Sequence, residues 1–323
     1  RAGSAGDVFE SDITANDASL RLVATRPVNR GAIRMGLDTR SRFNLAATDG
    51  RQEYDAQGQI IDSVQQETIE DARQTDAGLF VEGERELGAG RQSLSAGLRG
   101  TYVTTSNEGG TFGDLSTSST NFSGFLAYSL RPVPRWATVF QIARGFREPF
   151  LSDRYFAGVT GRGFVLGNPD LDPETSLQFD VSVRRTGGVT SLAIYGYLYR
   201  IQDLVERYEV TPDRFTFRNR GEQEIRGIEI ESDFDLGSAF SARVTANYSQ
   251  GEILDDGSNP DDIPAPSIRV SAYGQPLKRL WWRTGYSYFF RDDRPGPTEM
   301  ETPSYGVLDA SMGYRVADGF ETR

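Results

Sequence analysis

Apolar and charged side chains alternate along almost every extended segment of this chain. Between residues 33 and 45, one face carries Ile33, Met35, Leu37, Phe43 and Leu45, and the other carries Arg34, Asp38, Arg40, Arg42 and Asn44. A period of two is that of a β-strand, whose successive side chains point to opposite faces. The buried core of a sandwich could not hold such a charged face. The polar face must therefore meet water or a polar filling.

The pattern predicts thirteen strands. They begin near residues 18, 31, 74, 91, 119, 135, 174, 188, 214, 240, 264, 279 and 304. The segments near 135 and 188 alternate poorly, so the pattern does not assign their faces. Elsewhere one face carries Leu, Val, Ala and Phe, with Tyr and Trp toward the strand ends, as the aromatic girdle of a membrane barrel requires.

Two kinds of connection take turns between these segments. The short ones are 26–31, 86–91, 131–136, 185–190, 235–240, 274–279 and 316–321. The longer ones are 47–73, 107–118, 147–173, 253–263 and 294–303, with 211–213 as a tight exception. Tight turns at one end and longer loops at the other are typical of an outer-membrane β-barrel. A soluble sandwich or propeller also alternates, with its polar side outward, but the strand lengths, aromatic ends and loop rhythm favour the membrane.

Composition excludes several classes of function. The 323 residues contain no Cys and no His, which excludes disulfides, His-ligated metal sites and a Ser-His-Asp triad. The net charge of −11 argues against nucleic-acid binding. The 19 Phe and 14 Tyr argue against disorder. The longest strongly apolar stretch, 192–199, is too short for a membrane-spanning helix.

Three further segments carry a family resemblance. They are "ARGFREPFLSDRYF…GNPDLDPETSLQFDVSVRR" (143–185), "FRNRGEQEIRGIEIESDFDL" (217–236) and "YGVLDASMGYRV" (305–316). In order, spacing and strand polarity they resemble the later part of the barrel of a TonB-dependent outer-membrane receptor. In that family a "GFREP"-like strand end leads into a large extracellular loop, and a "GNPDLDPETS"-like turn starts the next strand. Pro169 and Pro173 would restrict the backbone where the chain re-enters the wall.

The resemblance implies an antiparallel transmembrane barrel in the outer membrane of a Gram-negative cell. Residues 1–323 would form part of one barrel domain, with the N-terminal plug, the early strands and the last strands absent from this chain. Within the family's 22 strands, the thirteen segments would correspond to strands 8 to 20. An odd number of strands points to a fragment with two unpaired sheet edges, because bacterial single-chain barrels have even numbers.

The implied function is energised uptake of a scarce nutrient, such as a ferric siderophore or cobalamin. The candidate ligand-binding residues lie in the loop 147–173 or at its edge: Phe146, Arg147, Arg154, Tyr155, Arg162 and Phe164. Arg pairs with anionic oxygens and stacks on aromatic groups, which suits an anionic ferric chelate. These residues could instead pack the loop and bind lipopolysaccharide phosphates. The implied partners are outer-membrane lipid and lipopolysaccharide, the small-molecule ligand and a TonB-type energising protein, which would contact the missing N-terminal part.

Other functions remain open at this point. A passive porin would explain the strands but not the motifs, and an enzyme would have to rest on carboxylates such as Glu229, Glu231 and Asp233. The acidic turn of Asp170, Asp172 and Glu174 could bind a metal, but such residues usually cap backbone donors. The segment 255–262 supplies hard oxygens for calcium without EF-hand spacing. We therefore expect no catalytic residue, no metal and no cofactor, and the sequence does not identify the transported ligand.

Overall fold

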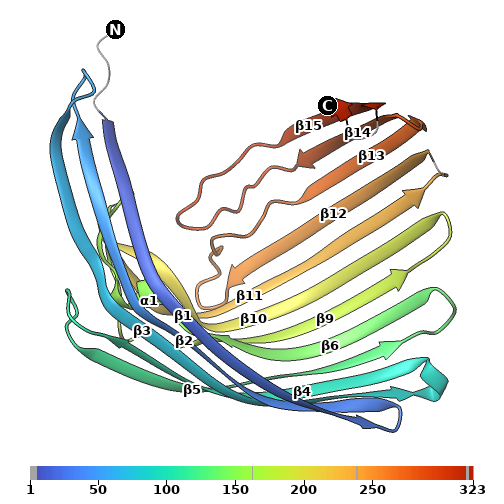
Figure 1. Cartoon of the computed structure of the whole chain (residues 1–323), viewed down its shortest axis with the longest axis horizontal. Coiled ribbons are helices and arrows are strands. Elements are labelled where there is room, and N and C mark those ends of the chain that lie inside the picture. The colour runs from blue at the N-terminus through green and yellow to red at the C-terminus, as the bar shows by residue number, and fades with distance from the viewer. Residues whose placement is uncertain (1–5, 162, 238, 318–319, 323) are drawn as a thin grey trace.

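A single curved sheet dominates the computed structural model, which describes residues 6–161, 163–237, 239–317 and 320–322 (Figure 1). Its main path contains β1 (Gly6–Val28), β2 (Gly31–Tyr54), β3 (Ile60–Leu87), β4 (Gln92–Asn107), β5 (Leu115–Leu130), β6 (Trp136–Arg147), β9 (Glu174–Arg185), β10 (Thr190–Thr211), β11 (Arg214–Asp235), β12 (Phe240–Ile253), β13 (Ser267–Leu277), β14 (Leu280–Phe289), β15 (Tyr305–Ala317) and β16 (Phe320–Thr322). A strand stands at each of the thirteen predicted positions. No helix among the described residues has the length and apolarity to cross a membrane.

Each strand on this path pairs antiparallel with its neighbours, and the path follows chain order. One segment leaves it. Between β6 and β9 the chain forms α1 (Leu151–Tyr155), β7 (Ala157–Thr160) and β8 (Gly163–Leu166), while β6 pairs directly with β9. A 3-10 turn, η1 (Gly88–Gly90), lies between β3 and β4.

The two kinds of connection lie at opposite ends of the sheet. The turns β1–β2, β3–β4, β5–β6, β9–β10, β11–β12 and β13–β14 gather at one end, on the right of Figure 1. The longer connections lie at the other end. This confirms the predicted rhythm of short and long connections except at 47–73, where the connection is only residues 55–59. We call these the short-turn end and the long-loop end.

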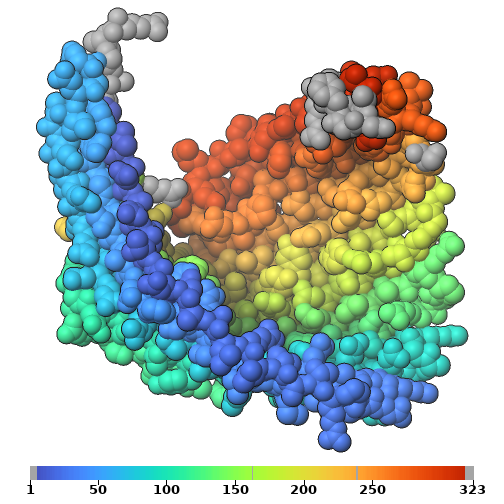
Figure 2. All heavy atoms as spheres, viewed as in Figure 1, coloured from blue at the N-terminus to red at the C-terminus, as the bar shows by residue number. Residues whose placement is uncertain are grey.

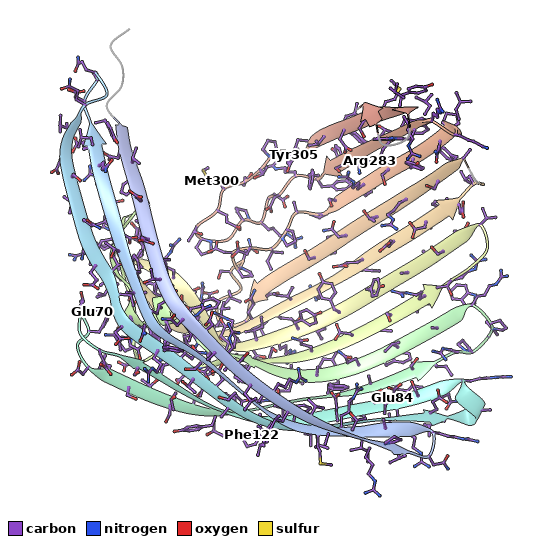
Figure 3. All side chains as sticks on the ribbon, viewed as in Figure 1. Glu70, Glu84, Phe122, Arg283, Met300 and Tyr305 are labelled. Atoms are coloured by element: carbon purple, nitrogen blue, oxygen red, sulfur yellow. The ribbon has the colours of Figure 1, made fainter. Side chains whose placement is uncertain are left out.

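The convex face of the sheet is apolar. Leu79, Leu98 and Phe122 are neighbours across β3, β4 and β5, and their exposures are 68%, 71% and 66%. Figure 3 shows Phe122 on this outer side. Apolar side chains exposed over a whole sheet face are rare in a soluble monomer. The convex face is therefore the apolar face that the alternation predicted.

The concave face is polar, and its charges pair across neighbouring strands. Arg99 on β4 holds Asp38 with two hydrogen bonds of 2.6 and 2.7 Å. On the far wall Arg269 lies 3.1 Å from Asp309. Arg283, labelled on the same wall in Figure 3, also belongs to this face by its register. Paired charges of this kind are common on a surface that is exposed to water or to a polar filling.

Two expectations near β2 were wrong. Leu45 was predicted on the lipid face, but it is buried on the concave side. Asn44 adopts a positive φ of 52°, and the pairing with β3 shifts between Arg42 and Leu45. This bulge inverts the alternation beyond it. The predicted loop 47–73 is mostly strand, because β2 and β3 continue past the bulge as a long hairpin.

The register assigns the faces that alternation left open. On β10, Tyr195, Tyr197 and Tyr199 lie on the concave face, and the rings of Tyr197 and Tyr199 stack with centroids 5.0 Å apart. Gly227, in the "RGIEIE" motif of β11, is directly opposite Tyr197. A Cβ at Gly227 would collide with the Tyr197 hydroxyl and lie 2.7 Å from the Tyr248 carbonyl oxygen. The glycine therefore makes room for the tyrosine ring.

This contact predicts that Gly227→Ala destabilises the sheet, by about 1–3 kcal/mol for overpacking. Gly83→Ala on β3 is the matched control, because its nearest neighbours lie 3.8 and 3.9 Å from the new Cβ. Samples of the full-length protein are heated to a series of temperatures and then run on a gel without boiling. The measurement is the temperature at which half of the folded, fast-migrating form is lost. Equal midpoints for the two variants would contradict the assigned contact.

Candidate ligand vestibule

Residues 148–173, which we call the crossing loop, leave the wall and cover part of the concave face. The pairing of β5 with β6 ends at Gly124 and Arg144, so the end of β6 departs from β5. Beyond this point α1 and β7 contact β3, whereas β8 pairs in parallel with residues 214–216 of β11. The loop thus reaches from β3 to β11 (Figure 1). The hollow of the sheet is visible in Figure 2 between the N-terminal strands and the later strands.

The first attachment of the crossing loop is apolar. Leu151 and Tyr155 of α1 pack on four residues of β2 and β3, namely Leu45, Ala47, Ile69 and Ala72. Further along, Gly158 packs against Thr68 so closely that a Cβ would not fit. Full burial of a large apolar side chain stabilises by about 1.5–3 kcal/mol. This cluster explains why Leu45 faces inward after the bulge.

A buried ion pair lies under the loop. The side chains of Arg154 and Glu148 are 4% and 8% exposed, with 3.8 Å between nitrogen and oxygen. Glu148 also accepts hydrogen bonds from Ser119 and Asn121 on β5, and Arg154 donates to the Pro169 carbonyl oxygen at 2.6 Å. Removing one member of such a pair leaves a buried charge without compensation. The pair therefore fixes the path of the loop over the wall.

The second attachment is made by the "GNPDLDPETS" turn. Asn168 donates to the Phe217 carbonyl oxygen at 3.0 Å. Asn219 accepts from the Asp172 N–H at 2.8 Å and donates to the Asp172 and Asp203 carbonyl oxygens at 2.9 and 2.8 Å. Phe217 and Asn219 belong to "FRNRG" on β11. The two motifs, which lie about 50 residues apart in the sequence, therefore bind each other, and we call these contacts the clamp.

Glu174 completes the clamp at the start of β9. Its carboxylate receives two hydrogen bonds of 2.7 Å from Arg147 and one of 2.7 Å from the Val205 N–H. Charge-assisted, two-point pairs of this kind are the strongest hydrogen bonds in proteins. The end of β6, the start of β9 and the β10 strand are thus joined at one point.

A cavity of about 510 Å³ opens between the crossing loop and the wall. Its polar lining includes Arg40, Arg42, Gln74, Asp76, Arg99 and Glu148, and its apolar lining includes Leu45, Ile69, Phe146, Phe150 and Leu151. Arg42 is held by Asp17 at 2.8 Å and Arg99 by Asp38 at 2.6 Å. Arg40 is exposed and has no carboxylate within 4.0 Å among the described residues. The cavity therefore offers one free guanidinium beside two paired ones.

The structure separates the six predicted ligand-binding residues. Phe146 lines the cavity. Arg147 holds Glu174, while Arg154 and Tyr155 are 3% and 1% exposed within the packing of the loop. Phe164 lies at the opposite attachment, beneath the Arg214 guanidinium, 5.3 Å from the ring centroid. Arg162 lies outside the described residues.

Sequence reasoning missed the arginines of the wall that faces the crossing loop across the cavity. Arg40, Arg42 and Arg99 come from β2 and β4, far from the loop in the sequence. Their only signal was the repeated Arg on one face of "DTRSRF" (38–43). Nothing in the alternation indicated that the loop would fold onto these strands.

The two acidic segments considered as metal sites have other contacts. Glu174 is paired with Arg147, and Asp172 uses its backbone in the clamp. In 255–262, Asp256 accepts from the Ser258 N–H at 2.9 Å and lies 2.5 Å from Arg220. Hydrogen bonds from Ser258, and then from Arg220, lower the pKa of the Asp256 carboxyl to about 2. Within the described ranges, no group of three or more acidic side chains is arranged to hold a metal ion.

Comparison with known proteins identifies relatives of the whole segment. The family model described as "TonB dependent receptor-like, beta-barrel" matches residues 4–323. The vitamin B12 transporter BtuB of Vibrio vulnificus is 28% identical over 178 residues, which are 54% of this chain and 27% of that protein. The iron-regulated outer membrane virulence protein of Vibrio cholerae is 24% identical over 217 residues, 57% of this chain and 32% of that protein.

Solved structures share the fold. The copper transporter OprC superposes with a TM-score of 0.79 at 17% identity, over 96% of this chain and 50% of that one. The ferric yersiniabactin uptake receptor FyuA from Yersinia pestis gives 0.73 at 14% identity, over 97% and 48%. The chain spans about a third or less of the length of these curated relatives and about half of these solved structures.

The clamp predicts that Asn219→Ala frees the crossing loop without unfolding the wall. The substitution removes three hydrogen bonds and leaves their partners unpaired, a local cost of about 2–3 kcal/mol. Limited proteolysis of the full-length protein should cut within 148–173 at least tenfold faster, while the strands stay intact. Asn16→Ala, at an exposed position on β1, is the control and should cut at the wild-type rate. Unchanged cutting in Asn219→Ala would contradict the clamp.

The docking of the loop should also depend on pH. Burial, with a smaller contribution from the charge of Glu174, raises the pKa of the Asp153 carboxyl despite the lowering by the Phe150 N–H, Arg147 and Arg154. A carboxyl whose pKa is raised in the docked state stabilises docking at low pH. This stabilisation is complete below the ordinary carboxyl pKa near 4, and it is lost as the pH rises through the raised pKa. We expect the wild-type loop to be better protected at pH 5 than at pH 7.

Asp153→Asn should remove most of this difference, because an amide does not titrate. The amide oxygen can still accept the hydrogen bond from the Phe150 N–H, so the docked loop is preserved. Papain, which is active at both pH values, would measure the cleavage rates of 148–173 in the full-length protein. Asp170→Asn, at an exposed position in the same loop, is the control and should keep the wild-type dependence. If Asp153→Asn retained the full pH dependence, another group would be the one that titrates.

Proposed function

The chain belongs to the TonB dependent receptor-like β-barrel family, and from this premise we propose that the protein takes up a scarce nutrient across the outer membrane by an energised mechanism. The family is one of outer-membrane receptors and transporters rather than enzymes. This agrees with the predicted localisation and with the prediction of a non-enzymatic role.

We further propose that residues 1–323 are part of one barrel domain in a longer protein. The length that the relatives have beyond the matched region supports this proposal, since it leaves room for a plug and for the remaining strands. The proposed energising partner, a TonB-type protein, would act on such a plug. Outer-membrane lipid would surround the convex face.

The proposed ligand is an anionic ferric chelate of the siderophore class, with cobalamin as the second candidate. The observation that carries this choice is the cavity under the crossing loop, where Arg40, Arg42 and Arg99 meet the rings of Phe146 and Phe150. Guanidinium groups pair with anionic oxygens and stack on flat ligands. Asp17 and Asp38 already pair with Arg42 and Arg99, so the free Arg40 would supply most of the attraction for an anion.

The alternative is a passive porin, and energy dependence separates the two. The test is uptake of labelled ferric chelates and labelled cyanocobalamin in cells that have the full-length protein as their only receptor. Energised uptake of a ferric chelate would stop when a protonophore is added. Uptake that continues unchanged with the protonophore would support the porin and overturn the proposal.

Arg40→Gln should weaken binding of the transported ferric chelate about tenfold, because a charge-assisted hydrogen bond contributes about 1.5–3 kcal/mol. The measurement is the concentration for half-maximal uptake, with surface abundance checked by antibody. Arg85→Gln, an exposed arginine near the short-turn end of β3, is the control and should leave uptake unchanged. Equal uptake by both variants would remove Arg40 from the proposed site.

A further inference from the structure

The convex face carries three arginines that the proposed uptake function does not use. We propose that Arg144, Arg200 and Arg226 bind the phosphate groups of an outer-leaflet glycolipid, whose acyl chains lie on the apolar face below them. All three are exposed. Arg144 and Arg200 face the same residue, Leu177 of β9, from its two sides, and Arg226 is opposite Leu198 on the strand next to Arg200. The three therefore belong to one face and to neighbouring strands.

The three arginines share one height above the short-turn end. Arg144 lies eight residues after Trp136, Arg200 ten after Thr190 and Arg226 nine before Asp235. Nine residues of strand, at about 3.3 Å each and a tilt of about 40°, rise roughly 23 Å. The apolar band of an outer-membrane barrel is about 25 Å tall. The guanidinium groups therefore stand at the outer edge of the band, where lipid headgroups begin.

Each guanidinium has a hydrogen-bond partner on a neighbouring strand. Arg144 donates to the Phe122 carbonyl oxygen, and Arg226 donates to Gln250 at 3.2 Å. Neither has a carboxylate within 4.0 Å in the described part of the chain. Arg200 is paired with Glu224 at 3.1 Å and lies 4.0 Å from Glu222. Arg144 and Arg226 therefore keep a positive charge that no carboxylate pairs with among the described residues. A phosphate monoester or diester complements this charge.

An apolar groove lies directly below this row. It has a volume of about 600 Å³, and its lining includes Ile142, Phe179 and Leu198, each two residues further toward the short-turn end than Arg144, Leu177 and Arg200. Gly196 also lines the groove, and its missing side chain leaves a hollow beside Val181. Phosphate-binding groups above an acyl-sized groove match the two parts of an amphipathic lipid, and a free phosphate would use only one of them.

The test is binding of diphosphorylated lipid A to the full-length protein in detergent, measured by native mass spectrometry of retained lipid. Arg144→Gln with Arg226→Gln should weaken binding at least tenfold. Arg26→Gln with Arg85→Gln removes the same charge at exposed positions near the short-turn end and should bind as the wild type does. Migration in an unheated gel shows that each variant is folded. If the double variant does not fold, the Arg226→Gln variant alone should still weaken binding.

Two lipid controls separate the sources of the phosphate. Lipid A stripped of its phosphates should bind at least tenfold more weakly to the wild type, and inorganic phosphate at millimolar concentration should not displace the intact lipid. Equal binding of the stripped lipid would overturn the proposal, because the arginines would then have no role. Displacement by inorganic phosphate, or wild-type affinity in the double variant, would overturn it as well.

Discussion

The hydrogen-bonded register between neighbouring strands is the constraint on which the rest of this structure depends. Side chains alternate between faces with a period of two, so a slip of one residue would turn the charged face toward lipid and the apolar face toward the lumen. Across β3, β4 and β5 the pairing keeps Leu79, Leu98 and Phe122 on one side. The same pairing brings Arg99 and Asp38 together on the other side. One register therefore positions both the apolar convex surface and the charged vestibule.

Alternation was sufficient to predict the strands but not every face. It succeeded where one face is charged, as on β2, because burial of a charge is costly. It left β10 open because Tyr195, Tyr197 and Tyr199 face the lumen opposite Leu192, Ile194 and Leu198, so both faces are apolar or aromatic. It was wrong at Leu45 because the bulge at Asn44 changes the parity without leaving a recognisable sequence signal.

The vestibule was predictable only in part, because it is made by long-range contacts. The motif "GNPDLDPETS" located the loop that closes it, and Phe146 does line the cavity. Arg40, Arg42 and Arg99, on β2 and β4, line the cavity only because α1 folds onto β3 and closes the space above them. No local sequence pattern encodes this contact. The resemblance named both motifs without relating them. The structure shows that hydrogen bonds from the side chains of Asn168 and Asn219 join the two motifs.

The crossing loop also bears on the order in which the wall is assembled. Its residues precede β9 in the chain, yet the partners of Asn168, Asp172 and Phe164 belong to β11 or to the turn before it. Contacts between residues distant in sequence form late, since the intervening chain must first be placed. The second attachment of the loop therefore needs β11 in place, whereas its first attachment uses only β2 and β3, which precede it in the chain. Closure of the clamp therefore marks a wall that has been built as far as β11.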